Sequence, residues 1–161
     1  MAFPWIFESN FEGGVVTEWD SESDTGSKLD IAHYSTLARA GGIGAAVPYR
    51  GAYCMRVVMG DANAHTLIEG DIDIADTVTR YSSFYFYLGN DVAATADDTF
   101  NIYEVQGTAD AVENAIGLRI TASTDAVEIG VGKVAPTVFA NATLTKGRWY
   151  NLELVSVIQT N

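Results

Sequence analysis

The chain has 161 residues, with 21 acidic and nine basic side chains, a formal net charge of −12 and one cysteine. This length predicts a single domain over residues 1–161 with a core of its own. The charge argues against nucleic acid and anionic membrane as partners, because both need a basic surface, and the lone Cys54 excludes a disulfide within the chain.

Short segments rich in Val, Ile, Tyr and Phe recur between clusters of turn residues, which predicts an all-β chain. In chain order the predicted strands are 5–11, 28–33, 52–59, 65–68, 82–88, 100–105, 115–120, 127–131, 137–139 and 149–157. The stretches "DSESDTGS", "ARAGGIGAAVPYRG", "GNDVAATADD" and "TASTD" supply the breaks. Many short strands without a long helix predict an antiparallel β-sandwich of two sheets.

The fifth of these strands, in "SSFYFYLGND", is apolar on both faces. Phe84, Phe86 and Leu88 alternate with Ser83, Tyr85 and Tyr87, so the two sets point to opposite sides of the strand. The first set is fully apolar, and the second is aromatic with hydroxyl tips. This pattern predicts a central strand whose inner face is core and whose outer face is either covered or binds a ligand.

Three segments carry a family resemblance: "FESNFEGGVVTEW", "YRGAYCMRVV" and "LTKGRWYNLEL". Together they resemble the laminin-G-like branch of the concanavalin A-like jelly rolls, and carbohydrate-binding jelly rolls share a similar opening and Gly-x-Tyr strand. The matching residues are Phe11, Glu12, Gly13, Trp19, Gly51, Tyr53, Phe84, Phe86, Gly147, Trp149, Leu152 and Leu154. The resemblance implies a jelly-roll sandwich in which Trp149 packs against the Phe84 and Phe86 face in the core.

The resemblance also bears on the end of the chain. In laminin-G-like domains a further strand follows the one matched here by residues 149–157. We therefore expect either a fragment that lacks its last strand or a subunit whose open edge is covered by a neighbour, through strand addition or packing. The expected state is a homo-oligomer or a particle lattice.

Two groups of residues with carboxylate or amide oxygens are candidates for chemistry. Asp71, Asp73 and Asp76 have a spacing similar to the acidic motif of jelly-roll glycosidases. Their short side chains and the lack of a flanking Trp-rich cleft favour a solvated acidic connection instead. Glu8, Asn10 and Glu12 alternate along the first predicted strand and are a candidate calcium site, although no diagnostic ligand spacing is present.

The exposed aromatic residues are the remaining candidate site. Tyr85 and Tyr87, with Tyr103 on the next strand, form a candidate platform on which a sugar ring stacks, because tyrosine has an apolar ring and a polar tip. The alternative is that residues 38–50, a Gly-Ala-rich loop, or a neighbouring subunit cover these rings.

These observations predict a non-enzymatic protein without a required cofactor. The first hypothesis is a structural, decoration-type protein on the surface of a virion or other particle, with a lectin-like fold. This agrees with the acidity, the few lysines, and an N-terminus without the features of a signal peptide. The second is a carbohydrate-binding module of a secreted or cell-surface protein, and a glycoside hydrolase is a distant third. The expected location is extracellular or on the virion surface.

Overall fold

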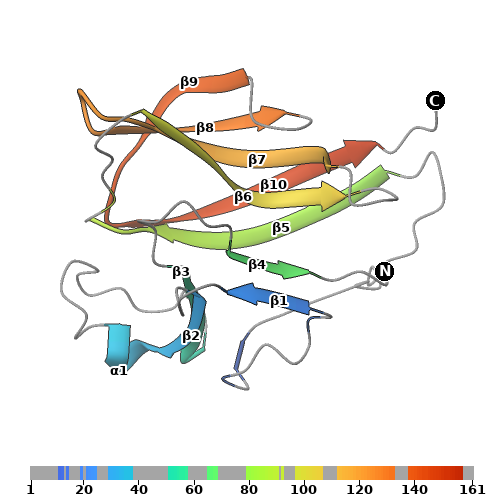
Figure 1. The fold of residues 1–161 in the computed structure, drawn as a ribbon, viewed down its shortest axis with the longest axis vertical. Helices are drawn as coiled ribbons and strands as arrows, with labels where there is room; N and C mark the ends of the chain where they lie inside the picture. Colours follow the sequence, from blue (N-terminus) through green and yellow to red (C-terminus); the bar gives the residue numbers. More distant parts are fainter. Residues whose placement is uncertain are drawn as a thin grey trace. The chain divides into compact units, whose positions relative to one another are not determined.

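The computed structural model describes residues 11, 12, 14, 19, 21–24, 29–37, 51–57, 65–68, 79–90, 92, 97–106, 112–132 and 138–157. These residues form antiparallel β-sheets and one short helical turn (Figure 1). The chain divides into two compact units. The first comprises Met1–Tyr87 with Trp149–Asn161, and the second comprises Leu88–Arg148.

The first unit contains three two-stranded sheets among the described residues, pairing β1 with β4, β2 with β3, and β5 with β10. Its elements are β1 (Ser21–Asp24), β2 (Leu29–His33), α1 (Tyr34–Leu37), β3 (Tyr53–Val57), β4 (His65–Ile68), β5 (Thr79–Leu88) and β10 (Arg148–Val157). The last residue of β5 and the first of β10 belong to the second unit.

Strand β1 corrects the prediction that "DSESDTGS" is only a break between strands. Its Ser21 lies opposite Ile68 of β4 and its Asp24 lies opposite His65. Aspartate and, to a lesser degree, glutamate are depleted in strands, but pairing with a distant strand overrides a weak local preference. The Asp24 carboxylate also accepts the backbone N–H of Leu29 at 3.1 Å, which ties β1 to the start of β2.

Strands β2 and β3 form a ribbon that buries part of β2. Leu29 and Ala32 are 7% and 3% exposed. Across the ribbon His33 lies opposite Tyr53, and their rings meet edge to face with centroids 5.1 Å apart. Such pairs of rings stabilise a sheet through both contact area and the electrostatics of the ring edge.

The second unit is a four-stranded antiparallel meander in the order β6-β7-β8-β9, which Figure 1 shows as one sheet. Its strands are β6 (Asp98–Gln106), β7 (Val112–Thr121), β8 (Ala126–Gly132) and β9 (Val138–Leu144). Strand β6 carries a bulge between Asn101 and Tyr103, where the partner residues are Gly117 and Ile116. One extra residue in β6 therefore changes the face to which the following side chains point.

Strand β7 is the centre of the core of this unit. Its residues Ala115, Ile116 and Leu118 are 0%, 3% and 2% exposed, Gly117 between them is also buried, and Val127 of the neighbouring β8 is 1% exposed. Because successive side chains point to opposite faces, burial of neighbouring positions means that both faces of β7 are covered.

Nine predicted strands are confirmed by β2 to β10. Strand β4 has the predicted bounds, β5 to β10 are each longer than predicted, and β2 and β3 are shorter. The remaining predicted strand, 5–11, lies outside the described residues except for Phe11. That residue has a φ of 59° and its carbonyl accepts the N–H of Gly14 at 2.9 Å, so it belongs to a turn and not to an extended strand. The all-β class is confirmed, because nine of the predicted strands are present.

Candidate functional site

One face of β5 is exposed to solvent and rich in tyrosine. Tyr81 is 77% exposed and Tyr85 is 42% exposed, and Ser83 between them is also exposed. The alternate residues Phe84 and Phe86 are half-buried, and Leu88 is 3% exposed. The alternation expected from the sequence is therefore present, with an apolar side that turns inward and an aromatic side that turns outward.

Strand β10 extends this exposed face. Tyr87 packs against Trp149 with ring centroids 5.5 Å apart and planes tilted by 58°, whereas Phe86 stacks on Tyr150 at 5.3 Å. As the residue number rises on β5 it falls on β10, as it does in an antiparallel pair. Trp149 therefore shares the face of Tyr87.

This arrangement corrects the prediction that Trp149 packs on the Phe84 and Phe86 face. The ring that stacks on Phe86 is that of Tyr150, the residue directly after Trp149. A shift of one residue moves a side chain to the opposite face of a strand, and only the pairing of two distant strands decides which residue lies inward.

Polar groups lie among the aromatic rings. The Ser83 hydroxyl hydrogen-bonds to Asn151 Oδ1 at 3.2 Å, and Asn151 Nδ2 donates to Glu153 Oε1 at 3.3 Å. Val155, farther along β10, is 56% exposed. We call this surface the tyrosine face, and it comprises Thr79, Tyr81, Ser83, Tyr85, Tyr87, Trp149, Asn151, Glu153 and Val155.

The structure brings together two of the three tyrosines predicted to form a platform. Tyr85 and Tyr87 lie two residues apart on the tyrosine face. Tyr103 lies in the second unit, half-buried on β6 opposite Ile116, so its part in the platform stays a prediction. Two aromatic members of the face were missed. Tyr81 could have been found because it continues the alternation before Ser83, whereas Trp149 is placed on this face only by the register of β10 against β5.

The candidate calcium residues are only partly described. Glu8 and Asn10 lie outside the described residues. Glu12 Oε1 accepts the backbone N–H groups of Ala52 and Tyr53 at 2.9 and 3.2 Å. Its carboxylate thus anchors the turn before β3. Within the described part of the chain, no group of three or more His, Cys, Asp or Glu side chains is placed to hold a metal ion.

The position of Glu12 explains why Gly51 stands at this turn. Gly51 has a φ of 71°, and a Cβ atom at this position would lie 1.9 Å from Glu12 Oε1. Glycine satisfies both demands because it has no Cβ and adopts positive φ at little cost. The motif residues Glu12, Gly51 and Tyr53 therefore meet in space, through a contact between segments some 40 residues apart.

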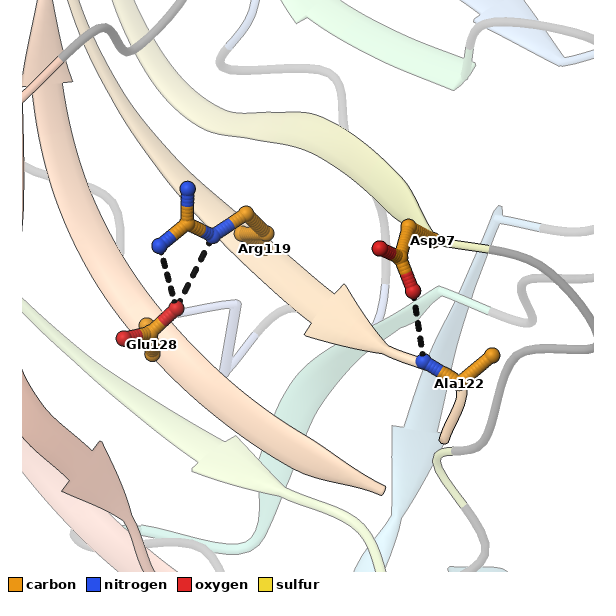
Figure 2. Close-up of polar contacts among 4 residues, drawn as sticks. All are labelled: Asp97, Arg119, Ala122 and Glu128. Atoms are coloured by element: carbon orange, nitrogen blue, oxygen red, sulfur yellow. Dashed lines mark hydrogen bonds and ion pairs between the residues drawn. The ribbon is translucent and has the colours of Figure 1, made fainter. Parts of the chain in front are cut away.

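The polar contacts of the second unit connect neighbouring strands and turns (Figure 2). Arg119 donates from Nε and Nη2 to Glu128 Oε2 at 2.8 and 2.6 Å across β7 and β8. The Asp97 carboxylate accepts the backbone N–H of Ala122 at 3.0 Å, where β7 ends. These contacts hold the sheet and its turn together.

Two residues with nucleophile or base chemistry lie on β2 and β3. Burial raises the pKa of the Cys54 thiol, and this opposes formation of the thiolate that a nucleophile needs. The His33 ring packs on Tyr53, and its Nδ1 lies 2.8 Å from the Ser35 hydroxyl. The acidic residues Asp71, Asp73 and Asp76 lie outside the described residues.

Comparison with known proteins finds no matching family model, no matching curated protein and no matching solved structure. Among the described residues, no helix is long and apolar enough to span a membrane.

Proposed function

We propose that the protein is a non-enzymatic binding module at the surface of a particle or cell, and that the tyrosine face binds carbohydrate. The observation that carries this proposal is the exposure of Tyr81 and Tyr85, at 77% and 42%, on one strand face. Large aromatic side chains left in water on a regular surface are typical of a binding site. Their rings offer apolar contact to the flat side of a sugar ring, and their hydroxyls bind its hydroxyl groups.

The polar residues of the face support the same ligand class. Ser83, Asn151 and Glu153 offer hydroxyl, amide and carboxylate groups beside the rings. A ligand that is apolar on its ring face and rich in hydroxyl groups matches this mixture of contacts. A fully apolar ligand would remove water from these polar groups without offering hydrogen bonds in exchange, which costs binding free energy.

A glycan array probed with the purified protein tests the proposal. We expect binding that Tyr85→Ala abolishes and Tyr85→Phe largely keeps, because phenylalanine preserves the ring. Thr99→Ala, at an exposed position of β6 in the second unit, is the matched control and should bind like the unchanged protein. An array without any hit, or a hit that survives Tyr85→Ala, would refute this function.

A second candidate is a structural subunit of a particle such as a virion. It is favoured by Met55 and Val57, which are 39% and 42% exposed two residues apart on β3. Apolar side chains next to each other on an exposed strand are a ready contact for a second subunit. The net charge of −12 agrees with a partner other than nucleic acid.

Light scattering and electron microscopy separate the two candidates. A structural subunit should be oligomeric in solution and should co-purify with particles from its native source. Met55→Ser should then shift the protein toward a monomer, with Thr99→Ser as the control. A monomer of about 17.3 kDa at high concentration would argue against the subunit role.

For the architecture we infer a two-sheet jelly-roll sandwich of the laminin-G-like type, with carbohydrate-binding jelly rolls as the alternative. The support is the antiparallel all-β order of elements and the alternation of β5, whose Phe84, Phe86 and Leu88 side turns away from solvent. An experimentally determined structure with two facing sheets would confirm this inference, and one with two separate units would contradict it.

A further inference from the structure

We propose that the ligand of the tyrosine face is a linear, uncharged oligosaccharide chain that lies along β5, rather than a single terminal sugar. This inference rests on the proposed carbohydrate function and adds the length and charge of the ligand. Two independent features of the face carry it, namely the spacing of the aromatic rings and the distribution of charge.

The rings are spaced along the strand. Tyr81, Tyr85 and Tyr87 stand on the same side of β5 at intervals of four and two residues. A strand rises about 3.3 Å per residue, so these intervals correspond to about 13 and 7 Å, and the row is about 20 Å long. One sugar ring stacks on one aromatic ring at a time. A ligand that contacts the whole row must therefore contain several linked rings.

The two ends of the row differ. At one end the rings of Tyr87 and Trp149 meet at 58°, which gives a tilted pair instead of a flat plate. At the other end Tyr81 is the most exposed aromatic residue of the face, at 77%. This predicts one main contact region around Tyr85, Tyr87 and Trp149, and an outer contact at Tyr81 that only a longer chain reaches.

The space between these two regions is polar. Ser83 stands between Tyr81 and Tyr85, and its hydroxyl is joined to Asn151, which is joined to Glu153. A chain that connects the two aromatic regions must cross these groups, and its hydroxyl groups can exchange hydrogen bonds with them. The position of these polar residues therefore agrees with a ligand long enough to span both aromatic regions.

The charge of the face selects against acidic glycans. Glu153 is its one ionisable carboxylate among the described residues, and the face includes no lysine or arginine. The whole chain carries a net charge of −12. An anionic polysaccharide would be repelled without any basic partner to compensate, whereas an uncharged chain pays no such cost.

The test measures affinity as a function of chain length by isothermal titration calorimetry. The probes are cello-, laminari-, manno-, xylo- and malto-oligosaccharides of two and six units, with alginate oligomers as the anionic probe. We expect the hexamer of a bound series to bind at least about tenfold more tightly than its dimer, and alginate to bind more weakly than either.

Tyr81→Ala should reduce hexamer affinity by about three- to tenfold and dimer affinity by less, while Tyr81→Phe keeps the ring and serves as the matched control. Equal affinity for dimer and hexamer, or binding confined to alginate or to terminal sugars on the array, would overturn this inference and leave the carbohydrate function standing. Absence of any glycan binding would overturn both. Both would also be overturned if the protein self-associated through this face, bound no glycan, and became monomeric on Tyr81→Ala.

Discussion

Replacement of Gly51 by alanine should destabilise the first unit by about 3 kcal/mol, because two constraints meet at this residue. Its φ of 71° lies in the left-handed region, which costs a residue with a Cβ atom about 1–2 kcal/mol. The new Cβ would also lie 1.9 Å from Glu12 Oε1, so the carboxylate must move away. It then gives up the N–H groups of Ala52 and Tyr53, a loss of about 1.5 kcal/mol at this exposed site.

A double-mutant cycle measured by urea unfolding checks the reasoning. Glu12→Ala alone should cost about 1.5 kcal/mol, since it removes the hydrogen bonds without adding strain. In the Glu12→Ala background, Gly51→Ala should cost only the backbone strain, about 1–2 kcal/mol. The double variant should therefore lose less stability than the two single losses together. Additive losses would refute the contact between Gly51 and Glu12.

Three further predictions concern other parts of the chain. Leu118→Ala, which empties a position only 2% exposed on β7, should cost about 2–5 kcal/mol, and a calorimetric loss under about 1 kcal/mol would contradict its burial. Arg119→Ala breaks an ion pair whose side chains are 41% and 24% exposed, so it should cost less than about 1 kcal/mol; a larger loss that persists in high salt would be unexpected. Burial raises the pKa of the Cys54 thiol, so the folded thiol should react slowly with thiol reagents near neutral pH. For the same reason, the free energy of unfolding should fall as the pH rises from the ordinary thiol pKa through the raised one. Reaction as fast as that of a free thiol would count against this.

The pattern of side chains along the chain was enough to predict the class and most of the strands. The run 65–68 coincides with β4, and the alternation in "SSFYFYL" gave the inward and outward sides of β5. Such features are local, because a strand that is buried on one side repeats every two residues whatever it pairs with. The two tyrosines of the candidate site, Tyr85 and Tyr87, followed from the same repeat.

Other features depended on contacts between segments far apart in the chain. Strand β1 forms because β4 pairs with it, although its own residues favour a turn. Trp149 joins the tyrosine face because the register of β10 against β5 places it beside Tyr87. Glu12 meets the turn at Gly51 across about 40 residues. Register and long-range hydrogen bonds have no period in the sequence, so only the tertiary structure decided them.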